Sequence, residues 1–224
     1  MATLLAQLLE VVEVCVISGG QFGQFESQLI AGLPGSATPL FGRLHLLPTC
    51  GTQYYRYEDG WKQQYAENLT AAQKERTLAV LEASAKELGL WESTTWGPIL
   101  EDRGSQITFS ALGQEAPVDA KRAWDPTGAK KESLRAAVAP QLPELEVRSG
   151  GSTSIDVTRK GIDKAYGMRR LAELTSIPID RMVFVGDRLD AGGNDYPVKS
   201  TGVRTYAVTD WRDTARFVEA FLGR

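Results

Sequence analysis

The residues best suited to chemistry lie in FVGDRLDAGGND, Phe184 to Asp195, directly behind a short apolar run. In a parallel sheet, the loops at the carboxyl ends of the strands form the ligand crevice, so we expect Asp187 to project its carboxylate into a site. The paired glycines would let the loop turn back and bring Asn194 and Asp195 beside it. Oxygen ligands of this kind suit Mg²⁺, which uses one or two carboxylates plus waters and a substrate phosphate.

Two further positions could handle a phosphate group. Ser18 ends an early apolar run, where its hydroxyl and the backbone N–H groups of Gly19 and Gly20 could hold phosphate oxygens. Lys164, early in a predicted helix, can place a compact positive charge against a transferring phosphoryl group. Taken singly, these residues read as a helix N-cap and a solvated lysine, and the Gly-Asp pair as a polar turn. The order and spacing of the three elements together favour a phosphate site.

The elements that must position these residues alternate between helix and strand. Apolar spacing and turn residues predict a helix near the start, two short buried strands, a hairpin turning at Asp59-Gly60 and a helix that ends at Gly89. The strands cover 13–18 and 44–47, and Thr70 with Gln73 forms a capping box for the helix before Gly89. After Lys160 the rhythm returns as helix, strand, strand and a last helix from about 210 to 222. This third of the chain also reads as α/β.

The middle of the chain changes character. SQITFSAL alternates like a strand with one exposed face, KKESLRAAVAPQL reads as a short helix, and LEVRSGGSTSIDV gives two more strands. We therefore predict an α/β protein with a Rossmann-like, doubly wound parallel sheet and an inserted α+β cap domain. The core covers residues 1–68 and 158–224, and the cap covers 69–157.

Composition limits the classes of function. The chain has 224 residues, a formal net charge of -3 and a pI near 5.4, with no basic block, which argues against nucleic acid or an anionic membrane as main partner. Cys15 and Cys50 show neither metal-ligand nor disulfide spacing. No run of eighteen apolar residues and no signal peptide is evident, so we expect a cytoplasmic protein.

The segments around these residues carry a family resemblance. SGG after an early strand, then GGSTSIDVTRKGIDKAYGMRRL and FVGDRLDAGGND, resemble the haloacid dehalogenase superfamily of Mg²⁺-dependent phosphotransferases, and most closely its eukaryotic-type phosphomannomutases. The resemblance implies that Ser18 is the phosphate-binding second motif and Lys164 the third, with both acting in catalysis. It assigns Asp187, Asn194 and Asp195 to the metal.

The resemblance also assigns residues of the cap and the partners. It implies that Arg103 grips the distal phosphate, that Ser154 and Asp156 contact the sugar, and that Gly19 and Gly20 help to bind the substrate. Mg²⁺ would be the cofactor, a phosphorylated sugar the substrate, and pairing through caps would give a homodimer. A second cap arginine of the family is replaced by Gln114, with Lys121 and Arg122 only loosely available instead, so phosphatase activity gains on mutase activity and both stay open.

One family segment has no match in this sequence. The nucleophile of the superfamily lies in a D-x-D-G-T segment on the first strand, where the first aspartate attacks phosphorus and forms an aspartyl-phosphate. We expect that aspartate upstream of Met1, which would then be an internal methionine. Without its strand, two inner edges of the sheet would be unpaired. Two functions stay open: Mg²⁺-dependent phosphoryl transfer on a small phosphosugar, and a catalytically inactive phosphosugar-binding or regulatory protein on the same fold.

Overall fold

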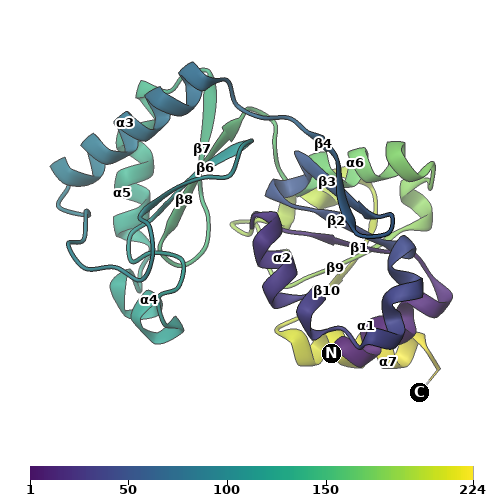
Figure 1. Ribbon diagram of the computed structural model, residues 1–224. Coiled ribbons are helices and arrows are strands. Elements are labelled where there is room, and N and C mark those ends of the chain that lie inside the picture. The colour runs from purple at the N-terminus through teal and green to yellow at the C-terminus, as the bar shows by residue number, and fades with distance from the viewer. Residues whose placement is uncertain (224) are drawn as a thin grey trace. The chain divides into compact units, whose positions relative to one another are not determined.

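The computed structural model describes residues 1–223 (Figure 1). The chain divides into two compact units, which we describe separately. Unit 1 joins the two ends of the chain, Met1–Ala66 and Ile162–Arg224, and unit 2 is the continuous segment Glu67–Gly161. The middle of the chain is therefore an insertion between two halves of one folded unit.

Unit 1 contains strands and helices in alternation. Its strands are β1 (Val14–Ile17), β2 (Leu44–Leu47), β3 (Gln53–Tyr57), β4 (Trp61–Ala66), β9 (Val183–Gly186) and β10 (Arg204–Ala207). Its α-helices are α1 (Ala2–Val11), α2 (Phe22–Gln28), α6 (Lys164–Thr175) and α7 (Trp211–Phe221). Its 3₁₀ helices are η1 (Ile30–Gly32), η2 (Gly35–Arg43), η3 (Thr49–Gly51), η5 (Ile179–Arg181) and η6 (Tyr196–Thr201).

The strands of unit 1 form two separate sheets. One has the order β1-β2-β3-β4, with β1 parallel to β2 and an antiparallel β3–β4 hairpin, and the other is the parallel pair β10-β9. β1 and β9 each end their sheet, so within residues 1–223 each has one edge without a strand partner. Because Ser18 N–H donates to Leu47 O, alternation places the backbone groups of Cys15 and Ile17 on the open edge of β1. The open edges of β1 and β9 are the two unpaired strand edges expected without the strand of the D-x-D-G-T segment.

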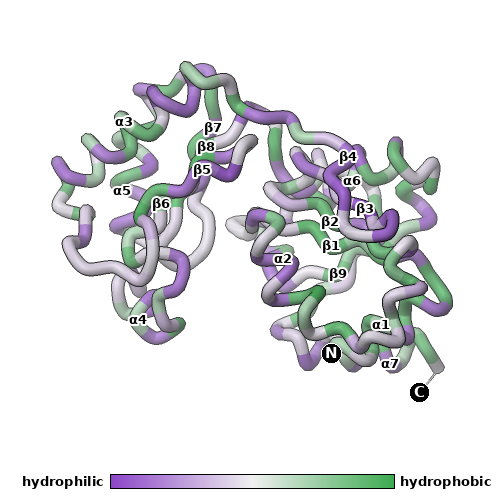
Figure 2. Tube along the Cα trace, viewed as in Figure 1, coloured by the Kyte–Doolittle hydropathy of each residue, from purple (hydrophilic) through white to green (hydrophobic). Residues whose placement is uncertain are grey.

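Helices cover both faces of the β1–β2 pair. Residues of α1 and α2 pack against one face, in a cluster that includes Leu9, Phe25 and the β2 leucines Leu44 and Leu46. Leu171 of α6 packs against the other face. β1 and β2 are predominantly hydrophobic along the trace in Figure 2, as expected for strands with helices on both sides.

Unit 2 is an antiparallel sheet with helices on one face. Its strands are β5 (Leu100–Asp102), β6 (Gln106–Ser110), β7 (Leu145–Ser149) and β8 (Ser154–Arg159), in the order β5-β6-β8-β7. Its helices are α3 (Ala71–Glu87), α4 (Val118–Trp124), α5 (Ala129–Val138) and η4 (Ala139–Gln141). Alternate residues of the central strands, such as Ile107, Phe109 and Ile155, join α3 and α5 in one hydrophobic core. The opposite face carries polar side chains.

The structure confirms the predicted α/β fold class and most of the predicted elements. The second strand has the predicted bounds, the hairpin turns at Asp59 and Gly60, and α3 begins with the capping box of Thr70. Gly89 follows α3 with a φ of 65°, a conformation that favours glycine. The prediction missed β5 and α4, which are short.

Candidate active site

The loop after β9 holds a buried carboxylate and an exposed one. Asp195 is 1% exposed, and its Oδ2 accepts a hydrogen bond of 3.1 Å from the Arg188 N–H, while its own N–H donates to Arg188 O at 3.1 Å. A Cβ at Gly186 would lie 2.5 Å from Asp195 Oδ2, so only glycine allows the carboxylate this close to the end of β9. Asp187, the first residue after β9, is exposed.

Lys164 pairs with the buried carboxylate. It is the first residue of α6, whose N-cap Asp163 accepts a hydrogen bond of 2.8 Å from the Tyr166 N–H. The Lys164 ammonium contacts Asp195 Oδ1, and its side chain is 12% exposed. The predicted third and fourth motifs therefore meet through an ion pair between residues 31 positions apart in sequence.

The residues after β1 form a tight turn against η3. Ser18 O accepts a hydrogen bond of 2.9 Å from the Cys50 N–H, and Gly20 O accepts one of 3.0 Å from the Thr49 N–H. Gly20 N–H donates to Ser18 Oγ at 3.1 Å. The Ser18 hydroxyl and the glycine backbone of the predicted second motif thus lie together at the carboxyl end of β1.

Two glycines bring this turn against the first turns of α6. A Cβ at Gly51 would lie 2.7 Å from Gly167 Cα, and a Cβ at Gly167 would lie 2.2 Å from Ile17 Cδ1 and 2.7 Å from Cys50 O. Larger residues at these positions would separate α6 from η3. The carboxyl ends of β1 and β9 therefore both lie at the N-terminal end of α6, with Ser18 on one side and the Lys164 ion pair on the other.

The side chains at the carboxyl end of β9 include some of the oxygen ligands that a hard cation such as Mg²⁺ needs. Residues 1–223 contain no group of three or more His, Cys, Asp or Glu side chains arranged to hold a metal ion. The Asp195 carboxylate is already bonded to Lys164 and to the Arg188 N–H, whereas Asp187 and Asn194 are exposed. One exposed carboxylate and one amide oxygen fit Mg²⁺, which keeps several waters and commonly uses a substrate phosphate as a further ligand.

Asp190 in the same loop forms a surface ion pair. Its Oδ1 accepts a hydrogen bond of 3.1 Å from Arg188 Nε, and this bond holds the pKa of Asp190 below its ordinary value. The same bond raises the pKa of Arg188. Asp190 is therefore a turn residue tied to its neighbour.

The predicted cap residues share the polar face of the unit 2 sheet. Cross-strand pairs place Glu101, Thr108, Asp156 and Arg148 in one row across all four strands. Thr108 Oγ1 donates to Asp156 Oδ1 at 2.8 Å. Burial raises the pKa of Asp156, and the hydroxyl of Thr108 and the positive charge of Arg103 oppose that rise.

Ser154 lies beside Asp156 at the start of β8. Its Oγ accepts a hydrogen bond of 2.7 Å from the Gly151 N–H. A Cβ at Gly150 would lie 2.7 Å from both Ser154 Oγ and Asp156 Oδ2, so glycine is required there. The GGSTS segment therefore supports the two side chains that the family resemblance assigns to the sugar.

Several other predicted positions take structural roles. Gln114 donates to Ser110 Oγ and Lys121 donates to Gln114 O at 2.6 Å, so both are engaged within unit 2. Trp124 is 9% exposed in the core of unit 2 and donates from Nε1 to Glu92 Oε1 at 2.9 Å, so it is a packing residue.

The sequence analysis missed Glu101, which forms an ion pair with Arg103. Arg103 donates to Glu101 Oε2 from Nε at 3.1 Å and from Nη2 at 2.5 Å. A glutamate two positions before an arginine in a strand points to the same face, and this signal was available in the sequence. His45 is 1% exposed and hydrogen-bonds to Glu13 and Tyr54, contacts that no local sequence pattern indicates.

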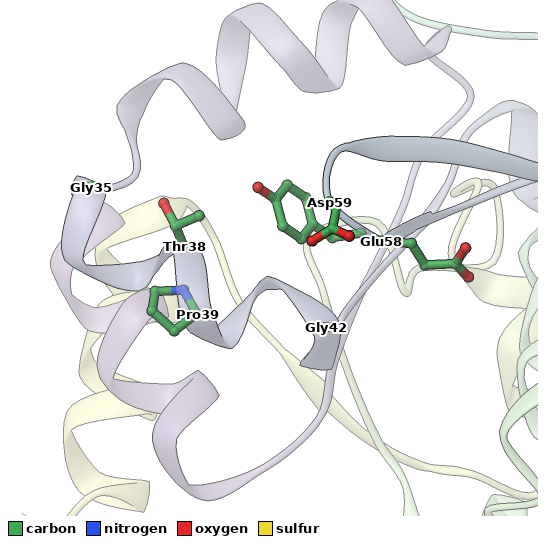
Figure 3. A pocket seen from close by; sticks show the side chains of 7 residues that line it. Gly35, Thr38, Pro39, Gly42, Glu58 and Asp59 are labelled. Carbon is green, nitrogen blue, oxygen red and sulfur yellow. The ribbon is translucent and has the colours of Figure 1, made fainter.

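A cavity of about 650 Å³ lies elsewhere on unit 1, between η2 and the β3–β4 turn. Figure 3 shows Glu58 and Asp59 on the turn and Thr38 and Pro39 on η2. It is lined by Gly35, Thr38, Pro39, Gly42, Tyr57, Glu58 and Asp59. These include none of the predicted site residues, so we do not place the chemistry there.

Comparison with known proteins identifies the family. The family model described as "Eukaryotic phosphomannomutase" matches residues 1–223. The chain belongs to the eukaryotic phosphomannomutase family. It is thus a member of the haloacid dehalogenase superfamily, as the motifs suggested, and Ser18, Lys164 and Asp187 lie in the segments that carried that resemblance.

Curated relatives are similar over part of the chain. A phosphomannomutase of Spinacia oleracea is 29% identical over 134 residues, which cover 56% of this chain and 52% of the relative. "Phosphomannomutase 1" of Dictyostelium discoideum is 27% identical over 130 residues, which cover 54% of this chain and 51% of the relative. The chain thus spans about half the length of the curated relatives that it matches.

Solved structures support the fold. A haloacid dehalogenase-like hydrolase from Bacteroides thetaiotaomicron has a TM-score of 0.61 at 15% identity, covering 98% of this chain and 91% of the other. An N-terminally truncated IMP-nucleotidase from Plasmodium falciparum has a TM-score of 0.69 at 12% identity, covering 99% of this chain and 64% of the other. No helix within residues 1–223 has the length and hydrophobicity needed to cross a membrane.

Proposed function

We propose that the chain serves phosphoryl transfer on a small phosphorylated sugar, at the end of unit 1 where β1, β9 and the start of α6 meet. The observations that support the proposal are the ion pair between Lys164 and the β9 loop and the packing of the Ser18 turn on η3, which lies against α6, in a member of the phosphomannomutase family. Hydroxyl, backbone N–H and ammonium groups together form an anion site at a helix N-terminus.

In this proposal different residues bind the phosphate, stabilise its charge and hold Mg²⁺. Ser18 and the N–H groups of Gly19 and Gly20 would bind phosphate oxygens, with the Gly20 N–H exchanging its bond to Ser18 for one to the substrate. Lys164, held by Asp195, would place its positive charge against the transferring group. Asp187 and Asn194 would hold Mg²⁺, which neutralises phosphate charge when bound. In this proposal Asp195 positions Lys164 and closes the loop, because both of its oxygens are engaged.

The attacking group of the proposed reaction is a carboxylate on a further strand, lying between the open edges of β1 and β9. An aspartate there would attack phosphorus and carry the phosphoryl group as an aspartyl-phosphate. The second candidate is phosphosugar binding without turnover, which is favoured by the lack of a D-x-D-G-T segment in this sequence.

Phosphate release distinguishes the two candidates. The protein expressed from its complete gene would be incubated with Mg²⁺ and hexose 1-phosphate, hexose 6-phosphate or IMP, and ³¹P NMR would follow free phosphate and isomerised sugar phosphate. Turnover of a hexose phosphate that is abolished by Lys164→Met supports the enzyme. Binding of a hexose phosphate without turnover supports the second candidate, and a preference for IMP would contradict a sugar substrate.

A further inference from the structure

The short turn η3 supports the Ser18 turn in a backbone conformation that itself needs support. Thr49 and Cys50 of η3 have φ angles of 49° and 56°, and Gly51 follows with a φ of 91°. Left-handed backbone of this kind is sparsely populated by residues other than glycine. The N–H groups of Thr49 and Cys50 nevertheless donate to carbonyl groups of the Ser18 turn. The position of the Ser18 turn therefore depends on contacts that keep η3 left-handed.

A tyrosine hydroxyl supplies one such contact. Tyr65 of β4 donates a hydrogen bond of 2.6 Å to Gly51 O, and its side chain packs in a cluster with Leu47 and Leu171. Gly51 is buried, so removal of this hydroxyl would take a hydrogen bond from a carbonyl group that is shielded from water. The Tyr65 hydroxyl therefore stabilises the left-handed conformation of η3.

The ring of the same tyrosine contacts α6. The Arg170 guanidinium lies 5.0 Å from the centre of the Tyr65 ring, in a cation–π contact. Arg170 lies less than two helical turns beyond Lys164, the first residue of α6. A Cβ at Gly51 would lie 2.7 Å from Gly167 Cα, so η3 packs against this same part of the helix. Tyr65 thus contacts both η3 and the helix that begins at Lys164.

A second tyrosine of the same hairpin directs its hydroxyl to another partner. Tyr54 of β3 is the cross-strand partner of Tyr65, and their ring centres are 5.9 Å apart. Tyr54 is 5% exposed, and its hydroxyl forms a hydrogen bond of 2.8 Å with His45 Nδ1 on β2. The two tyrosines share a sheet and a cluster but differ in what their hydroxyl groups bond to. Tyr54 is therefore a matched control for removal of a tyrosine hydroxyl from this sheet.

We propose that Tyr65 is a positioning residue of the anion site, whose hydroxyl keeps η3 left-handed and so keeps the Ser18 turn in reach of a phosphate bound beside Lys164. The inference rests on the proposed function, because it concerns the same site. A phosphate bound from two sides gains from both only while the spacing between them is fixed. Loss of the Tyr65 hydroxyl should therefore weaken phosphate binding through η3, without any contact between Tyr65 and the ligand.

The test measures binding of inorganic phosphate by isothermal titration calorimetry, with Mg²⁺ present, to the protein expressed from its complete gene. Inorganic phosphate needs only the groups of unit 1. Tyr65→Phe removes the hydroxyl and keeps the ring that contacts Arg170. Tyr54→Phe is the control, and urea unfolding checks that each variant is folded. The double variant Tyr65→Phe with Cys50→Gly places at position 50 a residue that adopts the left-handed conformation readily.

Tyr65→Phe should bind phosphate at least about tenfold more weakly than the wild type, as when one charge-assisted hydrogen bond of a site is lost. Tyr54→Phe should bind phosphate like the wild type. Adding Cys50→Gly should return part of the affinity that Tyr65→Phe loses. Equal affinities of the two tyrosine variants, or a loss that Cys50→Gly does not reduce, overturns the positioning role of Tyr65 alone. Failure of the wild-type protein to bind phosphate overturns the proposed anion site and this inference with it.

Discussion

The ion pair between Lys164 and Asp195 should stabilise unit 1 strongly, and Lys164→Met should show it. The variant leaves the 1% exposed Asp195 carboxylate with the Arg188 N–H and without its counter-ion. Breaking a buried pair from one side costs about 3 to 5 kcal/mol, and because the Lys164 side chain is 12% exposed we expect the lower end, about 3 kcal/mol. The natural control is Lys62→Met, whose pair with Glu58 is 3.9 Å long and exposed on both sides.

Urea unfolding measures the loss of free energy, and hydrogen exchange along Lys164–Thr175 locates it in α6. Lys62→Met should cost less than about 0.5 kcal/mol, as surface pairs usually do. The double variant Lys164→Met with Asp195→Asn removes both charges and should recover part of the loss, because no unpaired carboxylate is left buried. A cost for Lys164→Met no greater than that of Lys62→Met would refute this reading of the pair.

Three further measurements test other parts of the structure. Gly167→Ala should destabilise the protein by about 1 to 3 kcal/mol, because the added Cβ would lie 2.2 Å from Ile17 Cδ1. The control is Gly23→Ala in α2, whose added Cβ has no atom within 4 Å and which should be neutral or stabilising. Equal effects of the two variants in urea unfolding would contradict the close α6–η3 contact. Burial lowers the pKa of His45 below 6.5, so the unfolded chain binds the proton more readily and the free energy of unfolding should fall as the pH drops from 6.5 towards the lowered value. His45→Gln should lose this pH dependence of stability. An unchanged pH dependence in the variant would assign it to other groups. In hydrogen exchange, Cys15 and Ile17 should exchange faster than the two β1 valines, since their N–H groups face the open edge, and equal protection would show that edge to be covered.

Local patterns in the sequence account for most of the fold. The capping box of Thr70 and Gln73 is complete within four residues, and the apolar run 44–47 is bounded by turn signals, so both could be read directly. β5 has three residues and follows Pro98, and it is defined by its pairing with β6 rather than by its own sequence. Short strands of this kind depend on tertiary contacts that no local pattern contains.

The candidate site was predictable as a set of motifs but not as a set of contacts. The carboxyl ends of parallel strands meet at one edge of a sheet, and this rule identified Ser18 and Asp187 as candidates from their positions after strands. The bond between Lys164 and Asp195 joins residues 31 positions apart, and nothing in either segment shows that Asp195 is the buried aspartate of the loop. The pairing of Arg103 with Glu101 was readable from strand alternation, but how far water is excluded from it required the structure.

The most direct test of the account is the binding of hexose 6-phosphate to the wild-type protein and to Asp187→Asn, measured by isothermal titration calorimetry with and without Mg²⁺. The account predicts saturable binding to the wild type that Mg²⁺ strengthens, and a loss of that Mg²⁺ effect in Asp187→Asn, because Asp187 is the exposed carboxylate at the end of β9. An equal response of both proteins to Mg²⁺, or no binding of the sugar phosphate to the wild type, would contradict a phosphosugar site at the ends of β1 and β9.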